Sequence, residues 1–322
     1  MSFNKILVFA VLVVVAGGGF LAGTLFVKDK QIFESLKTKF PLIDPARNFI
    51  DQEHYIVNIQ PLRTKLREMS KEFSKSGREV SVYVEFLNTG GNISINPNTY
   101  IWPASLSKVP LALAVMKKVE RGEWKLENEL VLMQGDADSK SGNLQTLLAK
   151  HPIGTRFTIE KLLEELLVNS DNTAFYIFLR NLSQDDLKAV IEGLGIEMLF
   201  SEEGKISAKE YSRILRSLYT ASLLNRVNSE KILEWLDRST FEIFLAGPIS
   251  DEIPFPHKYG EHLPFNVFAD SGIVYIADRP YIVSVMIQGK KGLPFEEEKE
   301  VASKFMQEVS DVVYKYFLEY KN

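Results

Sequence analysis

Apolar and polar positions alternate with a period of two near both ends of the chain, whereas a helical period dominates the middle. The stretch EVSVYVEFLNTGGNISINPN, residues 79–98, alternates around a Gly-Gly pair and predicts an antiparallel hairpin. NVFADSGIVYI at residues 266–276 and RPYIVSVMIQG at residues 279–289 predict strands that return near the end of the chain. Residues from about 103 to 239 carry helical periodicity and predict an all-helical insert.

A helix is predicted on each side of this region. Residues 61–77, PLRTKLREMSKEFSKSG, form an amphipathic pattern that ends at Gly77. Residues 296–320 place a row of apolar side chains on one helical face: Val301, Phe305, Val309, Val312 and Tyr316. The chain therefore predicts an α+β fold, in which the N- and C-terminal helices cover a mostly antiparallel sheet and the helical insert interrupts it. We expect residues 61–322 to form this single domain.

The N-terminal segment has the pattern of a membrane-directed sequence. The run KILVFAVLVVVAGGGFLAGTLFVKDK, residues 5–30, is apolar between its flanking lysines and about as long as a membrane-spanning helix. Residues 1–30 are predicted to be a membrane anchor or, alternatively, a cleaved signal peptide. Residues 31–60, with Pro41 and Pro45, are predicted to be a stalk or linker. Both alternatives place the domain outside the cytoplasm, at the membrane or secreted.

Composition excludes several classes of function. The net charge of −4 gives no basic surface that would attract nucleic acid. The absence of cysteine excludes disulfides, thiolate metal sites and a thiol nucleophile. The four histidines lack the spacing of metal ligands, so no metal or organic cofactor is expected. The sequence does not fix the oligomeric state.

Ser105 and Lys108 stand at the start of a wholly apolar run, VPLALAVM. Residues three apart lie on the same face of a helix or of a 3₁₀ turn, so the lysine amine can reach the serine hydroxyl. A lysine at the polar end of a buried helix is poorly solvated, which lowers its pKa and allows the neutral amine to act as a base. The alternative is a serine near a helix N-terminus followed by a solvated lysine. A second Ser-x-x-Lys, at Ser2 and Lys5, shows that the spacing alone does not decide.

Two further motifs follow in the chain. Ser170-Asp171-Asn172 lies between two predicted helices, and Lys258-Tyr259-Gly260 lies just before the returning strands. Ser-x-x-Lys, then Ser-Asp-Asn, then Lys-Thr-Gly is the set shared by class A β-lactamases and penicillin-binding proteins. The chain resembles this family from about Val82 to Gly289, and the resemblance implies the β-lactamase/transpeptidase-like fold.

The resemblance implies four catalytic residues. Ser105 would be the nucleophile that forms an acyl-enzyme, and Lys108 would accept its proton. Ser170 would relay a proton to the leaving nitrogen. Lys258 would add a positive charge that lowers the pKa of Lys108 and attracts a substrate carboxylate.

It also implies a set of substrate-binding residues. Asn172 would hold Lys108 and a substrate amide, and Tyr259 would occupy the second position of the third motif. The N–H groups of Ser105 and Glu261, the residue that follows Gly260, would form the oxyanion hole.

The chain departs from the family at two places. Tyr259 stands where the family has Thr or Ser, and its hydroxyl lies too far out to bind a carboxylate without rearrangement. The segment EGLGIEMLFSEEGKISAKEY is short, and it lacks the usual context of the glutamate that activates the deacylating water. Its Glu197, Glu202 and Glu203 are predicted to be solvated surface residues. Acylation would then be intact and hydrolysis of the acyl-enzyme slow.

Together these observations predict an extracytoplasmic serine acyl-hydrolase, similar to class A β-lactamases, that acts on a β-lactam or a D-Ala-D-Ala-like cell-wall peptide. A D-alanyl-D-alanine carboxypeptidase or penicillin-binding protein with slow β-lactam hydrolysis is the first alternative. A catalytically inactive wall-binding or scaffold module is the second. A serine esterase or amidase on the same scaffold is also open.

Deletion of residues 1–30 is expected to give a soluble, folded domain, because a polar stalk separates the apolar run from the first amphipathic helix. Circular dichroism and size-exclusion chromatography of the truncated protein test this. Several truncations in this region that all yield insoluble or unfolded protein would count against a dispensable anchor.

Overall fold

A computed structural model describes residues 42, 58–136, 146–196, 199 and 204–319 of the chain. The predicted anchor and nearly all of the predicted stalk lie outside these residues, so both stay predictions. Within the described ranges, no helix is long and apolar enough to cross a membrane.

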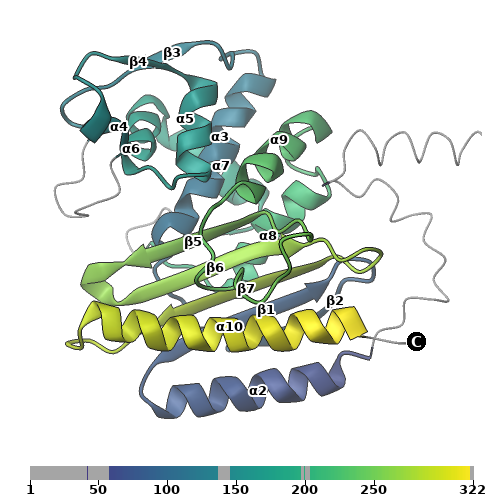
Figure 1. The fold of residues 1–322 in the computed structure, drawn as a ribbon. Coiled ribbons are helices and arrows are strands. Elements are labelled where there is room, and N and C mark those ends of the chain that lie inside the picture. Colours follow the sequence, from purple (N-terminus) through teal and green to yellow (C-terminus); the bar gives the residue numbers. More distant parts are fainter. Residues whose placement is uncertain (1–41, 43–57, 137–145, 197–198, 200–203, 320–322) are drawn as a thin grey trace, which may run out of the picture.

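A five-stranded sheet forms the centre of the molecule (Figure 1). Its strand order is β2-β1-β7-β6-β5, and every neighbouring pair is antiparallel. The strands are β1 (Glu79–Phe86), β2 (Gly91–Ile95), β5 (His257–His262), β6 (Val267–Val274) and β7 (Tyr281–Gln288). The predicted hairpin and the two returning strands are therefore confirmed, and β5 is an edge strand.

Helices cover both faces of this sheet. On one face lie α2 (Gln60–Lys75) and α10 (Phe295–Glu319). On the other lies the insert, with η3 (Ala104–Ser107), α3 (Lys108–Glu120), α4 (Thr146–Lys150), α5 (Ile159–Leu167), α6 (Asn172–Asn181), α7 (Gln184–Gly193), α8 (Ala208–Tyr219) and α9 (Arg226–Asp237). This arrangement confirms the predicted fold class.

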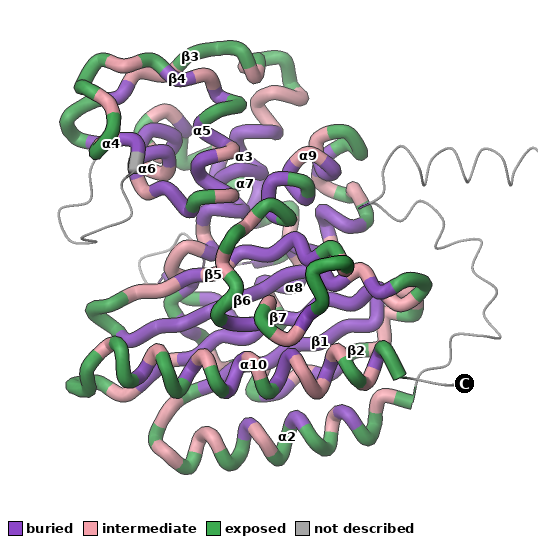
Figure 2. The backbone as a smooth tube through the Cα atoms, in the orientation of Figure 1, coloured by how far each residue is buried: buried purple, intermediate pink, exposed green. Residues whose placement is uncertain are grey.

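Strand alternation divides the core into two clusters. Val82 and Val84 of β1 join the cluster under α2 and α10, whereas Tyr83 joins the cluster on the side of the insert. Within the insert, α3 is the central helix, since every residue from Lys108 to Met116 is buried. Figure 2 shows this helix and the strands as the most continuously buried parts of the chain.

The insert is not all-helical, which corrects the prediction. It contains a two-stranded antiparallel sheet of β3 (Glu129–Val131) and β4 (Arg156–Thr158). Strands of three residues are too short to show a period of two, and their pairing joins segments far apart in the sequence. An isolated bridge between Ile101 and Ile206 was also not predicted.

The buried face of α10 is also shifted from the predicted one. Phe305 and Val309 are buried as expected, whereas Val301 is 36% exposed. The buried row includes Val313 and Phe317 rather than Val312 and Tyr316. The shift has a physical cause, because the ring of Phe317 stacks on two core rings, those of Phe86 and Tyr281.

An ion pair joins the two ends of the domain. Arg78, just before β1, donates from Nε to Glu298 Oε2 at 2.8 Å and from a terminal nitrogen to Oε1 at 2.5 Å. The Glu298 side chain is 1% exposed and also accepts the N–H of Lys290 at 2.9 Å. The pair therefore fixes the first turn of α10 to the beginning of the sheet.

Arg78→Ala is expected to lower the free energy of unfolding by about 3 kcal/mol, because it leaves the buried Glu298 carboxylate without its cation. Urea unfolding measures the difference. Lys75→Ala is the control: its ion pair with Glu72 lies on the surface, with 64% and 74% of the two side chains exposed, and its loss should change stability by less than about 0.5 kcal/mol. Equal effects of the two substitutions would contradict this prediction.

Candidate active site

Ser105 lies on the short 3₁₀ helix η3 that leads into α3. Ala104, just before it, has a φ of 49°, a left-handed conformation that costs free energy for a residue with a side chain. Tyr211 of α8 stabilises this turn, because its hydroxyl donates a hydrogen bond to the carbonyl oxygen of Leu106 at 3.1 Å. The turn brings Lys108 Nζ to 2.9 Å from Ser105 Oγ, which is the contact expected from the spacing of the two residues.

Lys108 Nζ reaches three other oxygens. It lies 2.7 Å from the carbonyl oxygen of Ser170, 3.2 Å from Ser170 Oγ and 2.6 Å from Asn172 Oδ1. Lys108 is only 2% exposed, so these groups replace its solvent. The first two motifs of the sequence thus meet at one nitrogen atom.

The chemistry of these oxygens favours a neutral amine. The Ser170 carbonyl and the Asn172 amide oxygen can only accept hydrogen bonds, and they lie closest to Lys108 Nζ. A neutral amine has two hydrogens, which these two acceptors use. Its lone pair then remains for the hydroxyl hydrogen of Ser105, which is the proton that a general base must take.

The electrostatic surroundings of Lys108 also favour its neutral form. Burial lowers the pKa of Lys108 well below its usual value, and the positive charge of Lys258 lowers it further, against the opposing effect of Asp171. The fraction of Lys108 that is neutral near pH 7 is therefore much larger than for a lysine in water.

Asp171, to which the sequence analysis gave no role, holds the second motif in place. Its Oδ1 accepts the N–H of Ala174 at 2.8 Å and caps α6, while Oδ2 accepts the N–H of Leu147 at 3.0 Å. Ser170 itself is buried and has a φ of 54°. The cap explains how the chain holds this strained residue with its carbonyl toward Lys108.

The third motif lies within the edge strand β5 rather than ahead of the strands. Gly260 is the point of closest approach, since a Cβ atom there would lie 2.9 Å from Ser105 N and 3.0 Å from the Pro103 carbonyl oxygen. Only glycine therefore allows β5 to lie this close to the backbone of Ser105. The Glu261 side chain forms an ion pair with Lys299 of α10 at 2.9 Å, on the side of the sheet away from Ser105.

Lys258 is the second buried lysine of the site, at 1% exposure. Burial lowers its pKa to about 7, against the opposing effect of the Asp270 carboxylate. Its Nζ donates to the Tyr259 carbonyl at 3.2 Å. Lys258 therefore influences Lys108 through its charge, and this charge is lost as the pH rises through about 7.

Two pairs around Lys258 were not singled out from the sequence. His257 Nδ1 lies 2.9 Å from Asp270 Oδ1, and both residues are buried. The ring of Tyr259 stacks on Phe241 with 3.6 Å between ring centroids and an angle of 5°. Both rings pack against the cluster on the side of α10, so the tyrosine does not take the place of a small hydroxyl beside Ser105.

Most of the chain matches the model of a known protein family. Residues 61–317 match the model of the family described as "Beta-lactamase enzyme family". The chain belongs to this β-lactamase family. Membership makes it a serine hydrolase of the β-lactamase type, and it confirms the family resemblance found from the three motifs.

The relatives are distant. The β-lactamase VEB-1 of Pseudomonas aeruginosa is 21% identical over 256 residues, which cover 72% of this chain and 83% of VEB-1. The structure of a PBP-A point mutant in an acyl-enzyme complex with penicillin G has a TM-score of 0.70 at 18% identity and covers 81% of this chain and 98% of its own. The TLA-3 extended-spectrum β-lactamase also has a TM-score of 0.70 at 18% identity, with 80% and 99% covered. These two structures show that the fold is shared.

The remaining candidates are placed as follows. Glu197, Glu202 and Glu203 lie outside the described residues, so their solvation stays a prediction.

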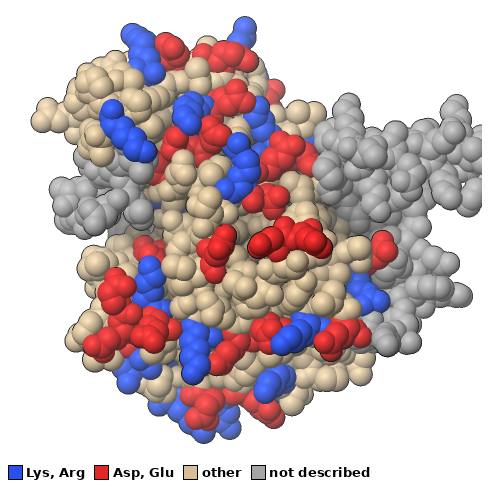
Figure 3. Space-filling model, in the orientation of Figure 1, with Lys and Arg blue, Asp and Glu red and all other residues tan. Residues whose placement is uncertain are grey.

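In the described parts of the chain, no group of three or more His, Asp or Glu side chains is arranged to hold a metal ion. On the face drawn in Figure 3, acidic and basic side chains are interspersed.

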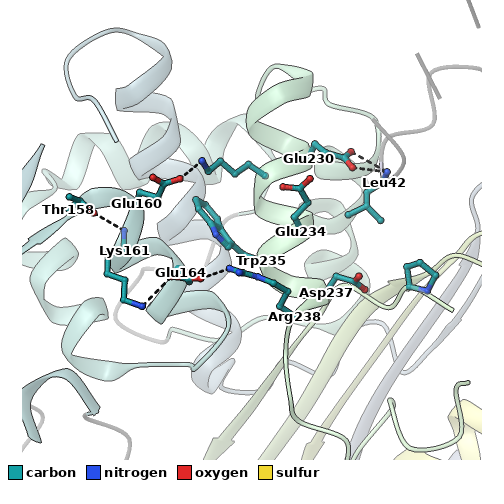
Figure 4. A pocket seen from close by; sticks show the side chains of 12 residues that line it. Leu42, Thr158, Glu160, Lys161, Glu164, Glu230, Glu234, Trp235, Asp237 and Arg238 are labelled. Atoms are coloured by element: carbon teal, nitrogen blue, oxygen red, sulfur yellow. Dashed lines mark hydrogen bonds and ion pairs between the residues drawn. The ribbon is translucent and has the colours of Figure 1, made fainter. Parts of the chain in front are cut away.

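A pocket of about 830 Å³ lies apart from the β-lactamase motifs, between α5 and α9 (Figure 4). Charged side chains line it and largely pair with one another, as Arg238 does with Glu164 at 2.7 Å. The N–H of Leu42 donates to both oxygens of the buried Glu230 there, at 3.0 and 3.1 Å. None of the residues of the three motifs lines this pocket, so the candidate active site remains the one at Ser105.

Lys108→Ala and Lys108→Arg are both expected to slow acylation of Ser105 by about a hundred- to ten-thousand-fold, because each removes a positioned general base. In the wild type, the rate should rise as the pH rises through the lowered pKa of Lys108, since only the neutral amine accepts a proton. This rise should be absent from both variants. Intact mass spectrometry after timed exposure to an activated ester measures the rates. Lys108→Arg is the decisive control: a near wild-type rate with its permanent charge would contradict base catalysis by Lys108.

Proposed function

We propose that the protein is an extracytoplasmic serine acyl-hydrolase that forms an acyl-enzyme on Ser105 with a β-lactam or a D-Ala-D-Ala-like peptide. One observation carries the proposal: the buried Lys108 amine lies 2.9 Å from Ser105 Oγ, and its two closest partners can only accept hydrogen bonds. Such an amine is set up to take the serine proton at neutral pH.

The proposed reaction has two stages. Ser105 Oγ attacks the carbonyl carbon of the amide, a C–O bond forms and the serine proton moves to Lys108 Nζ. The proton passes through Ser170 Oγ to the leaving nitrogen as the C–N bond breaks, which leaves an ester on Ser105 and a free amine. The N–H groups of Ser105 and Glu261 would stabilise the oxyanion. Water then cleaves the ester and releases a carboxylic acid.

The second stage is proposed to be slow, as in a penicillin-binding protein. In the described parts of the chain, the oxygens hydrogen-bonded to Lys108 Nζ belong to two hydroxyl groups, a carbonyl and an amide, and none is a carboxylate that could activate water. A mutant of PBP-A forms an acyl-enzyme complex with penicillin G. Since this chain shares the fold of PBP-A, the similarity supports the proposal that the chain can hold such an intermediate.

An inactive scaffold module is the weaker alternative. Burying a lysine costs several kcal/mol unless other groups compensate, and left-handed residues such as Ala104 and Ser170 cost about 1–3 kcal/mol each. A module without chemistry gains nothing from these costs. A buried lysine together with two such residues beside the Ser105–Lys108 pair therefore supports turnover.

The proposal is tested by exposing the protein, at full length and without residues 1–30, to fluorescent penicillin and to an activated ester. A mass increase on Ser105 that is absent from Ser105→Ala is the expected result. The lifetime of the adduct separates the two enzymatic alternatives, since minutes to hours indicate a penicillin-binding protein and seconds a β-lactamase. Absence of any adduct with both reagents would exclude the acyl-enzyme proposal.

Glu202→Gln and Glu203→Gln should leave the adduct lifetime nearly unchanged, because their charged, Gly-containing segment offers nothing that would tune a carboxylate for base catalysis at neutral pH. If Glu203→Gln traps an adduct that the wild type clears within seconds, the protein is a working β-lactamase with a relocated base.

A further inference from the structure

One residue of the predicted stalk, Leu42, is bound to the domain at three points. Its N–H donates to both oxygens of Glu230 on α9, at 3.0 and 3.1 Å. Its carbonyl oxygen accepts the hydroxyl of Tyr275, just after β6, at 2.5 Å. Its side chain is 6% exposed and belongs to the core cluster on the side of the insert. The domain therefore holds both backbone groups and the side chain of a residue that lies far away in the sequence.

Glu230 is an unusual partner for a stalk residue. Glutamate is almost never fully buried unless it is paired, and Glu230 is only 5% exposed. A buried carboxylate needs hydrogen-bond donors, because an unsatisfied one costs free energy. The N–H of Leu42 is such a donor, and Figure 4 shows it meeting both carboxylate oxygens. The fold therefore gains stability by keeping Leu42 in this place.

The elements that hold Leu42 are themselves fixed in the fold. Helix α9, which carries Glu230, is joined to α5 by an ion pair of 2.7 Å between Arg238 and Glu164. The N–H of Tyr275 donates to the Pro254 carbonyl oxygen at 3.1 Å, which fixes the backbone on the other side. Groups held in this way lose little conformational entropy when they bind a segment of chain.

We propose that Glu230 and Tyr275 form a clamp that binds the stalk of the same chain at Leu42. This inference goes beyond the proposed function, since no residue of the three motifs takes part in these contacts. The clamp shortens the tether between the predicted anchor and the domain. An extended chain from residue 30 reaches at most about 43 Å to Leu42, against about 110 Å to the start of α2 at residue 60. This step rests on the predicted anchor, which would then hold the domain close to the membrane.

Hydrogen exchange at the Leu42 amide tests the clamp in the full-length protein. Exchange is expected to be slow in the wild type, because this N–H is hydrogen-bonded to a buried carboxylate. Glu230→Ala should speed exchange about ten- to hundredfold, because it removes a charged acceptor. Tyr275→Phe should speed it about fivefold, because it removes the donor to the Leu42 carbonyl. Mass spectrometry of overlapping peptides measures the rates.

Glu234→Ala is the matched control, since Glu234 lies on the same helix and lines the same pocket but is exposed. It should leave exchange at Leu42 unchanged. Amides of the central helix α3 report whether each variant is folded. Tyr275→Phe keeps the ring and still tests the clamp if Glu230→Ala unfolds the domain. Exchange in the wild type at the rate of an unfolded chain would overturn the proposal, and so would equal rates in the wild type and the folded clamp variants.

Energy transfer from the domain to the membrane tests the short tether. The chain has no cysteine, so Lys188→Cys, at a side chain of α7 that is 70% exposed, can carry a single donor dye. With an acceptor dye on the lipids of phosphatidylcholine vesicles, transfer should fall when Glu230→Ala is added and stay the same with Glu234→Ala. Equal transfer in all three proteins, or a protein that does not stay on the vesicles, would overturn the short tether. The exchange rates then still decide whether the clamp exists.

The stalk of a second copy of the chain is the other possible occupant of the clamp. Sedimentation of the full-length protein in detergent is expected to give the same particle mass for the wild type and Glu230→Ala. A dimer that Glu230→Ala dissociates would show that two copies exchange their stalks, and it would overturn the proposal.

Discussion

The buried amine of Lys108 is the constraint on which the rest of the active site depends. Burial and the positive charge of Lys258 disfavour the ammonium form, and the two nearest partners of Nζ accept the two hydrogens of a neutral amine. The neutral form in turn leaves its lone pair for Ser105. The same packing that makes α3 the centre of the insert therefore favours the neutral amine of Lys108, which is the form that the proposed base catalysis requires.

In the third motif, Gly260 packs against the backbone of Ser105, whereas Lys258 affects the electrostatic balance of the site through its charge. Lys258 is buried and has a pKa of about 7, so it carries only part of its charge at neutral pH. Its motif neighbour Tyr259 stacks on Phe241 and packs on the side of α10. A substrate carboxylate near Lys258 thus meets a partial charge and no small hydroxyl group from residue 259.

The sequence predicted the parts of the fold that have a long, regular pattern. The hairpin, the returning strands β6 and β7 and the terminal helices show a clear period, and local propensity agrees with packing there. The central α3 was recognisable from its wholly apolar run. The sequence did not predict β3 and β4, because these strands are short and pair with a segment far away in the chain. It also gave the wrong buried face for α10, because the ring of Phe317 stacks on core rings. The Ser105–Lys108 contact was predictable because helical geometry fixes neighbours three residues apart. The roles of Asp171, Phe241 and Tyr211 were not, because their effect depends on segments brought together only by the fold.

Two residues near Ser105 and Lys108 have strained backbone conformations, and side chains close to them hold the chain in place. Ala104 and Ser170 both adopt left-handed conformations, and one precedes the nucleophile while the other supplies a carbonyl to Lys108. Hydrogen bonds hold the chain next to each of them: Asp171 accepts the N–H groups of Ala174 in α6 and Leu147 in α4, and Tyr211 donates to the carbonyl of Leu106. A ground state held in this way needs little rearrangement, which supports the proposed formation of an acyl-enzyme on Ser105.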